Sequence, residues 1–268
     1  MNLVFQKDFN DSMDEYMVEA EKICKDLDIT FCPIVIVPFE HTVVDDSLLK
    51  TLAGNSIAYG SNVISDIVHH YDLNPGLFHI TDNEAFTLSV LGSHYLNADM
   101  IFCTTENILD VLEASSLKDE EFFFMKPKDA KYFPGTIVDR KMIPFVIESQ
   151  GKHFGTPESY DICVSTIKRM ISEWRFFVVG NSIVAGSKYH TAEMRLDIQP
   201  GYPEEVKLFA EEMIETLKKV SNDDCYVIDI AEMETGEYKV VELNCLNNSG
   251  FYACDMRSIF EALKRKFK

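Results

Sequence analysis

The sequence has no long apolar run, no Cys-x-x-Cys pair and no short nucleotide-binding motif. No apolar stretch approaches the roughly 20 residues that a membrane-spanning helix needs, and the N-terminus does not resemble a signal peptide. The seven cysteines are scattered through apolar segments, which favours reduced, buried thiols and a cytoplasmic location over a zinc site. Neither G-x-x-x-x-G-K-[ST] nor G-x-G-x-x-G occurs, which argues against a P-loop and a Rossmann fingerprint.

Positive charge is scarce in this chain. There are 25 Lys and Arg residues against 44 Asp and Glu residues, which gives a net charge of −19. Because an acidic surface repels phosphate backbones and anionic lipid heads, we expect neither a nucleic-acid partner nor a membrane partner. Hydrophobic residues make up 46% of the 268 residues, which is enough for a packed core. The composition therefore predicts a soluble, folded protein and leaves its oligomeric state open.

The pattern of elements changes part of the way along the chain. Before residue 115, helix-like spacing at 10–27 and 63–70 alternates with strand-like runs at 31–37 and 56–61. From Glu121 onward, strand-like runs follow one another, and two amphipathic helices come later. We therefore expect an α/β (α+β) protein with a small N-terminal α/β domain, residues 1–114, and a second domain, residues 115–268.

A predicted β-hairpin at 225–244 carries candidate metal ligands. If Thr235 and Gly236 form its loop, Asp229 lies opposite Glu242, and Asn244 projects from the same face. Facing carboxylates repel each other, and a hard divalent cation would remove that conflict. Carboxylate and amide oxygens suit Mg²⁺ or Mn²⁺.

The alternative is a hairpin edge with solvated acids. It accounts well for the three glutamates near the turn, Glu232, Glu234 and Glu237, but poorly for the two acids that interrupt apolar runs, Asp229 and Glu242. The metal interpretation depends on register, since a slip of one residue would turn one side chain to the opposite face.

A second predicted hairpin, at 173–189, carries cations. With Gly180-Asn181 as its turn, Glu173 lies opposite Lys188 and Arg175 lies opposite Gly186, where a missing side chain leaves room for a ligand. Arginine suits bidentate phosphate contact, and lysine acts as a point charge. The alternative is a cross-strand salt bridge between Glu173 and Lys188 with a solvated Arg175.

The segment Phe122-Phe123-Phe124-Met125-Lys126-Pro127 is an apolar strand that ends in lysine and proline, and a loop follows it. A lysine at the end of a buried strand is able to point into a cleft and hold phosphate oxygens. The alternative is a solvated strand end.

The order of these parts resembles the ATP-grasp superfamily over roughly residues 115–255. The matching parts are Lys126-Pro127 with its loop, a hinge strand at 162–167, Glu173-x-Arg175, Lys188, and Asp229 with Glu242-x-Asn244. The nearest likeness is to a phage and bacterial branch, and more distantly to ribosomal-protein glutamate ligases. The resemblance implies an ATP-grasp fold preceded by a small pre-ATP-grasp α/β domain.

The resemblance also implies roles for particular residues, with ATP and Mg²⁺ (or Mn²⁺) as cofactors. Phosphate contacts fall to Lys126 and Lys131, adenine contacts to the hinge residues Ser165, Thr166 and Ile167, and the ribose contact to Glu173. Arg175 and Lys188 would steady the transferred phosphoryl group, and Asp229, Glu242 and Asn244 would hold the metal. The sequence departs from the family in having one glycine in the loop after Lys126 and Ser165-Thr166 where many members carry an acid.

The implied activity is ATP-dependent ligation of a carboxylate to an amine, on small-molecule or peptide substrates, with an acyl-phosphate intermediate. The polar loop at 247–252 would meet the acceptor, and Asn248 is the residue with which to test that role. Two alternatives stay open, an ATP- and Mg²⁺-binding regulatory or partner-binding protein that does not ligate, and a structural module. A protein kinase fits less well, because neither His-Arg-Asp nor Asp-Phe-Gly occurs.

Overall fold

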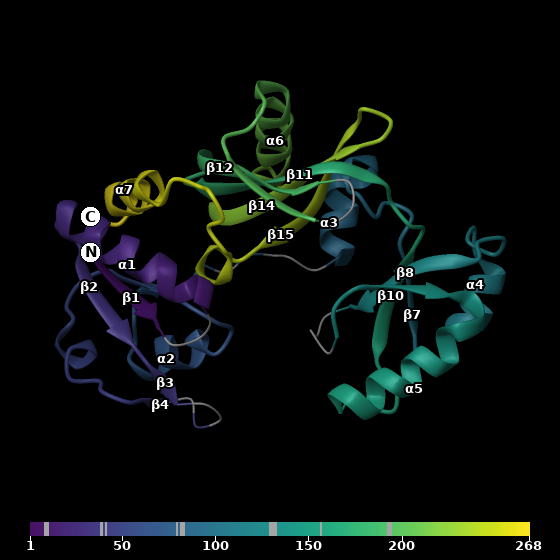
Figure 1. Cartoon of the computed structure of the whole chain (residues 1–268), viewed down its shortest axis with the longest axis horizontal. Coiled ribbons are helices and arrows are strands. Elements are labelled where there is room, and N and C mark those ends of the chain that lie inside the picture. The colour runs from purple at the N-terminus through teal and green to yellow at the C-terminus, as the bar shows by residue number, and fades with distance from the viewer. Residues whose placement is uncertain are drawn as a thin grey trace.

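The computed structural model describes residues 1–7, 11–37, 40, 42–78, 80, 84–128, 133–155, 157–191 and 195–268. Figure 1 shows a five-stranded sheet with α6 on one side of it, and two smaller α/β units on the other side. Lys131, an expected phosphate ligand, lies outside the described residues. No helix in the described part of the chain is long and apolar enough to cross a membrane.

The N-terminal unit is a parallel sheet of order β2-β1-β5-β6. Its strands are β1 (Asn2–Gln6), β2 (Thr30–Ile34), β5 (Ser56–Tyr59) and β6 (Pro75–Gly76), and the short pair β3 (Ile36–Val37) and β4 (Thr42–Val43) adjoins it. Helices α1 (Asp11–Asp26) and α7 (Met256–Lys266) share one apolar cluster with this sheet, and α2 (Ile64–His70) shares the other. Because both faces are covered, β1 is buried along its whole length.

The second unit is an antiparallel sheet of order β7-β10-β8-β9. Its strands are β7 (Ile101–Thr104), β8 (Phe122–Pro127), β9 (Thr136–Asp139) and β10 (Asp161–Ser165), and α4 (Ile108–Ala114) and α5 (Ile143–Phe154) share its apolar cluster. Because β7 precedes residue 115, this sheet takes strands from both sides of the expected boundary at 114/115. The division into two domains at that point stays a prediction.

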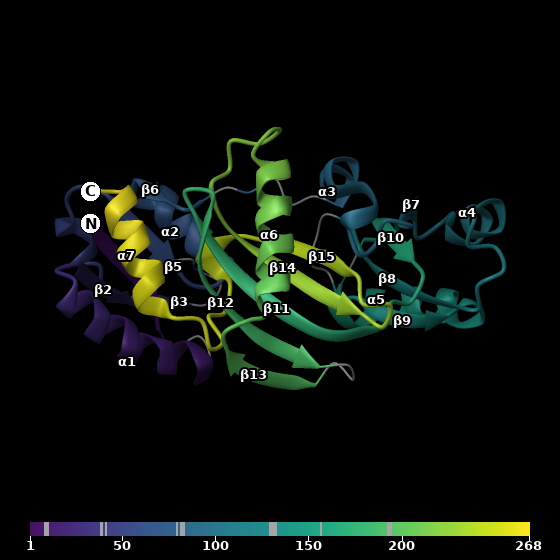
Figure 2. The same ribbon diagram turned by 90° about the horizontal axis from the view of Figure 1, so that it is seen from above.

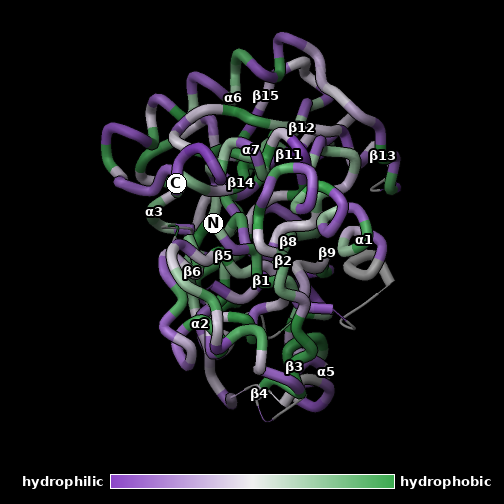
Figure 3. Tube along the Cα trace, turned by 90° about the vertical axis from the view of Figure 1, so that its left-hand side faces the viewer, coloured by the Kyte–Doolittle hydropathy of each residue, from purple (hydrophilic) through white to green (hydrophobic). Residues whose placement is uncertain are grey.

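The five-stranded antiparallel sheet has the order β13-β12-β11-β14-β15. Its strands are β11 (Met170–Val179), β12 (Ser182–Thr191), β13 (Leu196–Pro200), β14 (Cys225–Met233) and β15 (Tyr238–Asn244). Helix α6 (Glu204–Leu217) crosses one face (Figure 2), and α3 (Glu84–Leu91) contributes to the same apolar cluster. Hydropathy alternates along the α6 trace in Figure 3, as expected for a helix with one buried side.

The face of this sheet turned away from α6 is divided between packing and polar groups. Phe177, Val179 and Val227 belong to the apolar cluster that contains α7 and the N-terminal sheet. Farther along the same face lie Arg175 and Asp229, which are paired across β11 and β14. The candidate active site is built on this second stretch.

The hairpin at 225–244 has the predicted pair of acids in register. Asp229 lies opposite Glu242, whereas nearer the turn Ile230 lies opposite Val240, so Val241 is an extra residue. The turn is therefore offset by one residue from the prediction, and a bulge restores the predicted register at the acids.

The hairpin at 173–189 has the predicted turn, with positive φ angles of 63° at Gly180 and 59° at Asn181. Its predicted register is wrong beyond Phe177, because two irregularities shift the pairing. Arg175 lies opposite Ser187 rather than Gly186, and Glu173 lies opposite His190 rather than Lys188.

The space at Gly186 serves the core and not a ligand. Gly186 lies opposite Phe176. A Cβ atom there would approach the Phe176 side chain to 2.6 Å and the Tyr202 ring to 2.7 Å. The glycine therefore makes room for Tyr202, which packs edge-on against Phe176.

Candidate active site

A buried ion pair lies at the centre of the candidate site. The Nε and Nη2 atoms of Arg175 donate to Oδ1 and Oδ2 of Asp229 at 2.9 and 2.7 Å. Asp229 is fully buried and Arg175 is 7% exposed. The planar guanidinium group thus contacts both carboxylate oxygens, the geometry in which an arginine–carboxylate pair is strongest.

The charges of this pair are strongly perturbed by their surroundings. Burial raises the pKa of Asp229 to about 7, against the lowering effect of Arg175, and the nearby Glu242 and Glu173 raise it further. Burial opposes the charge on Arg175, but Asp229 outweighs burial and raises the pKa of the guanidinium group above its ordinary value. The site therefore holds a carboxylate whose charge depends on the arginine beside it.

Glu242 and Asn244 lie next to this pair. The Nδ2 atom of Asn244 donates to Oε1 of Glu242 at 2.8 Å and to Oδ2 of Asp229 at 3.3 Å. Glu242 is exposed to solvent, whereas Asp229 is not. The structure thus brings together all three predicted metal ligands.

The fit of these residues to a divalent cation is partial. No group of three or more His, Cys, Asp and Glu side chains in the described ranges is arranged to hold a metal ion. The donors are two carboxylates and an amide, and Mg²⁺ is usually bound by one or two carboxylates together with waters and substrate phosphates. Glu242 is available for this role, but Asp229 is engaged by Arg175 and would need to exchange it for the cation.

An aromatic wall that the sequence did not reveal flanks Arg175. The rings of Tyr189 and Tyr252 stack at 4.7 Å with an interplanar angle of 3°. The guanidinium carbon lies 5.3 Å from the Tyr189 ring centre and 5.0 Å from that of Tyr252. Such cation–π contacts hold the arginine over the two rings.

Glu173, the expected ribose ligand, lies on the same strand face as Arg175 but is already bonded. Its two oxygens contact the Tyr189 hydroxyl and, at 3.1 Å, Nδ1 of His190. Glu173 is 4% exposed. A ribose contact would therefore require one of these partners to give way.

Lys188 is not brought into this cluster. The bulge puts it opposite Trp174, whose side chain belongs to the α6-side core, and its Nζ atom donates to Asp197 at 2.8 Å. Directly opposed residues of an antiparallel pair project from the same face, so Lys188 points away from Asp229. The predicted grouping of Lys188 with Arg175 on one face is wrong for this reason.

Lys126 lies in β8 and is bound within its own chain. Its Nζ atom contacts Oε1 of Glu84, the first residue of α3, and the hydroxyl of Tyr95 donates to the other carboxylate oxygen. The lysine side chain is 21% exposed. Neither Glu84 nor Tyr95 was predicted, because each lies far from Lys126 along the sequence.

The hinge after β10 is fastened by a segment that precedes β7. The backbone N–H and the hydroxyl of Thr166 both donate to Oδ2 of Asp99, at 3.0 and 2.5 Å, and Lys168 pairs with the other oxygen. The Ser165 hydroxyl donates to the Asn97 side chain at 3.1 Å. Of the three expected adenine contacts, Ile167 is the most exposed, at 40%.

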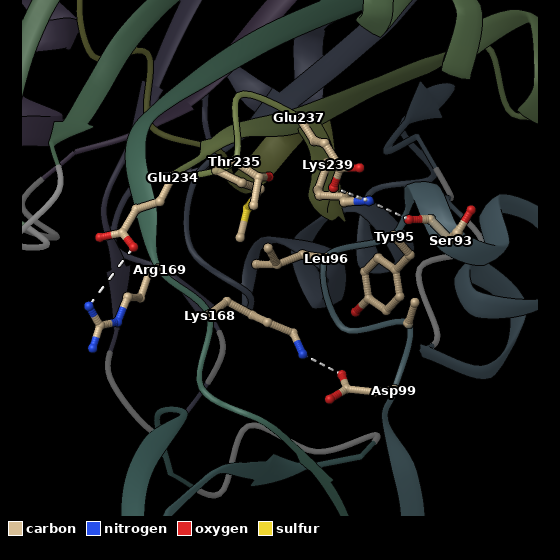
Figure 4. Close-up of a pocket in the computed structure, with 12 residues that line it drawn as sticks. Ser93, Tyr95, Leu96, Asp99, Lys168, Arg169, Glu234, Thr235, Glu237 and Lys239 are labelled. Atoms are coloured by element: carbon tan, nitrogen blue, oxygen red, sulfur yellow. Dashed lines mark hydrogen bonds and ion pairs between the residues drawn. The ribbon is translucent and has the colours of Figure 1, made fainter.

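A pocket of about 480 Å³ adjoins this hinge (Figure 4). Lys168 and Arg169 of the hinge line it together with Met233 and Lys239 of the β14–β15 hairpin. Met233 is four residues from Asp229 on β14, so the two share a face, and Lys239 lies opposite Ala231 on that face. The pocket therefore lies on the side of the sheet that carries the acids.

The loop at 247–252 is tied to the N-terminal sheet. Asn247 is fully buried, and its side chain donates to the carbonyls of Ala58 and Gly76 and accepts from the N–H of Phe78. Asn248 beside it is exposed. The loop also meets the central pair, because Nη1 of Arg175 donates to the Gly250 carbonyl at 3.3 Å.

Comparison with known proteins identifies the family. A family model described as an ATP-grasp domain, family 3 of its clade, matches residues 60–263. The match spans most of the chain, so the protein belongs to the ATP-grasp superfamily and, within it, to this clade family. No match was found among curated proteins.

Solved structures show the same fold at low sequence identity. D-cycloserine synthetase DcsG is 12% identical with a TM-score of 0.68, and both chains are covered completely. D-alanine–D-alanine ligase from Bacillus anthracis is 12% identical with a TM-score of 0.58, covering 98% of this chain and 91% of that one. A RimK domain ATP-grasp protein from Sphaerobacter thermophilus is 13% identical with a TM-score of 0.58, covering 100% and 95%. The predicted ATP-grasp fold is confirmed.

Proposed function

We propose that this protein is an ATP-dependent carboxylate–amine ligase that requires Mg²⁺ and forms an amide through an acyl-phosphate. The observation that carries the proposal is the pairing of Asp229 with Glu242, with Asn244 beside them and Arg175 bonded to Asp229. The family match and the ligase or synthetase titles of structural neighbours support the same class of activity.

In this proposal the nucleotide lies along the sheet face that carries Asp229. Adenine binds near the hinge at Ser165, Thr166 and Ile167, where the pocket supplies apolar surface from Met233 and Leu96. Glu173 meets the ribose, and Lys126 with Lys131 meets the phosphates. We leave Lys188 out of the transfer step, because Asp197 binds it outside the cluster.

Glu242 and Asn244 would hold the cation, with Asp229 joining them if Arg175 turns toward the phosphates. The bound metal would neutralise charge on the phosphate oxygens. Arg175 has fork geometry suited to phosphate, and burial strengthens its electrostatic effect.

The chemistry needs no protein nucleophile. An oxygen of the substrate carboxylate attacks the γ-phosphorus of ATP, ADP leaves, and an acyl-phosphate forms. The amine then attacks the acyl carbon, phosphate leaves, and the amine loses a proton to give the amide. Substrates are small-molecule or peptide carboxylates and amines, and the buried thiols and acidic composition favour work in the cytoplasm.

Trapping of the acyl-phosphate tests this function. Enzyme, ATP and Mg²⁺ are incubated with a panel of amino acids and dipeptides, and ADP release and hydroxamate formation with hydroxylamine are measured. We expect a carboxylate-dependent hydroxamate that is lost in Glu242→Gln and retained in Glu237→Gln, whose side chain is 64% exposed beside the same hairpin's turn. A hydroxamate yield unaffected by Glu242→Gln would contradict the proposed site.

A nucleotide-binding protein that does not ligate is the second candidate. It is favoured by one observation, which is that Lys126, Glu173 and Asp229 are all bonded to partners within the chain. That state would give Mg²⁺-dependent ATP binding without ADP release on any of the substrates tested.

A further inference from the structure

Glu84 places a negative charge on the lysine that the nucleotide would use. The Nζ atom of Lys126 directly contacts Oε1 of Glu84, and the two side chains are only 21% and 11% exposed. Glu84 begins α3, which packs against the core beneath α6, whereas Lys126 lies in β8. The contact therefore joins two separate parts of the fold.

Tyr95 holds the same carboxylate from the other side. Its hydroxyl donates to Oε2 of Glu84, and the ring is 1% exposed. Burial, with Glu84 adding to it, raises the pKa of Tyr95 above its ordinary value, so the hydroxyl keeps its proton at neutral pH. Glu84 thus has a permanent donor that is independent of Lys126.

Tyr95 is in turn fixed to the strand that carries the candidate metal ligands. Tyr95 forms a parallel bridge with Val240 of β15, and the N–H of Leu96 donates to the Val240 carbonyl at 2.8 Å. Figure 4 shows Tyr95 and Leu96 beside Lys239, the neighbour of Val240. Since β15 also carries Glu242, the Glu84–Tyr95 unit connects the lysine strand with the strand of the metal site.

We propose that Glu84 is a built-in competitor of nucleotide phosphate for Lys126, and that Tyr95 is the residue that receives Glu84 when phosphate takes the lysine. The inference rests on the proposed function, and it adds a determinant of nucleotide affinity to that site. It concerns the residues that regulate access to Lys126 rather than the residues that touch ATP.

The competition follows from charge. A phosphate oxygen and the Glu84 carboxylate on one ammonium group repel each other, so nucleotide binding must weaken or break the Glu84 contact. A nearly buried carboxylate without a partner would be costly. The Tyr95 hydroxyl reduces that cost, because it stays bonded to Glu84 throughout the exchange.

Two substitutions should change nucleotide affinity in opposite directions. Glu84→Gln removes the competing charge but keeps an oxygen that accepts from Tyr95, so binding should tighten. Tyr95→Phe leaves the released Glu84 without a donor, so binding should weaken. A purely structural role for both residues would weaken binding in both variants.

Calorimetric titration with Mg²⁺·ADP, which avoids turnover, measures these effects in the whole chain. We expect the Kd of Glu84→Gln to fall about tenfold, equivalent to about 1.4 kcal/mol, and that of Tyr95→Phe to rise about fivefold, equivalent to about 1 kcal/mol. Glu113→Gln is the matched control, because it removes one acid from α4 whose side chain is 80% exposed and pairs with Arg140. Its Kd should equal that of wild type.

The Lys126→Ala background separates competition for Lys126 from a general charge effect. There, Glu84→Gln should no longer tighten binding, because nothing is left to compete for. An equal gain in that background, or a Glu84→Gln Kd at or above wild type, would overturn the inference. Should Glu84→Gln fail to fold in a melting assay, Tyr95→Phe decides, and unchanged or tighter binding refutes the competition.

The two proposals fail in distinguishable ways. Wild-type protein that binds neither Mg²⁺·ADP nor Mg²⁺·ATP would overturn both. Normal wild-type binding with an unchanged Kd in Glu84→Gln would overturn the role of Glu84 and leave the ligase proposal standing.

Discussion

Replacing Arg175 by methionine removes the charge partner of a fully buried carboxylate. Arg175 supplies two hydrogen bonds to Asp229, and among the described residues the remaining side-chain donor is Asn244 at 3.3 Å. Breaking a buried ion pair on one side costs about 3–5 kcal/mol, because the other charge is left uncompensated. We expect a loss of that size in the free energy of unfolding at pH 8.

The loss should depend on pH in a defined direction. The pKa of Asp229 is about 7 with Arg175 present, and removal of the arginine raises it further. A group whose pKa is higher in the folded state stabilises the fold at low pH, and that contribution is lost as pH rises through the folded pKa. Arg175→Met should therefore be less destabilised at pH 6 than at pH 8.

Urea unfolding at both pH values measures this effect. Arg169→Met is the matched control, since Arg169 is 80% exposed and lies 3.9 Å from Glu234, and it should change stability by less than about 0.5 kcal/mol. The double variant Arg175→Met/Asp229→Leu should recover most of the loss, because no charge is left buried. A single variant within about 1 kcal/mol of wild type would refute the account of the pair.

Two further predictions concern the segments that hold the site in place. Asp99→Asn should cost about 1.5–3 kcal/mol at pH 7, because the carboxylate binds Thr166 and Lys168. The pKa of Asp99 is lowered, since burial, which raises it, is outweighed by Lys168 and Thr166. The difference from wild type in urea unfolding should thus shrink as pH falls through the folded pKa. Asn247→Ala should cost about 1–3 kcal/mol, because it leaves buried backbone groups unbonded, whereas the exposed Asn248→Ala should cost less than about 0.5 kcal/mol.

Either result can be contradicted directly. A pH-independent effect of Asp99→Asn would mean that its charge does not fasten the hinge. Equal stability of the Asn247→Ala and Asn248→Ala variants would mean that the loop is not tied to the N-terminal sheet through Asn247.

The sequence was sufficient for the acid pair because local pattern and chemistry agree there. Asp229 and Glu242 interrupt apolar runs on either side of a recognisable turn, so the alternation of a strand indicates that they face each other. The predicted turn was offset by one residue, and the extra residue Val241 cancelled the error.

The second hairpin shows why the same reasoning failed for Lys188. Its turn was recognisable from Gly180-Asn181, but its bulges were not, because they accompany contacts made elsewhere in the fold. Tyr202 fills the space at Gly186, and Tyr189 turns toward Glu173. No local pattern encodes either contact.

The partners of Lys126 and Thr166 were beyond prediction for a related reason. Glu84 is 42 residues from Lys126, and Asp99 is 67 residues from Thr166. Charged residues of this kind are common on surfaces, so only the fold distinguishes those that enter a site.

Calorimetric titration of ATP with and without Mg²⁺, on wild type, Glu242→Gln and the control Glu237→Gln, tests the central claim most directly. The account predicts that wild type and Glu237→Gln bind ATP more tightly with Mg²⁺, and that Glu242→Gln loses this dependence. ATP binding by Glu242→Gln with the full Mg²⁺ dependence of wild type, or no ATP binding by wild type, would contradict the account.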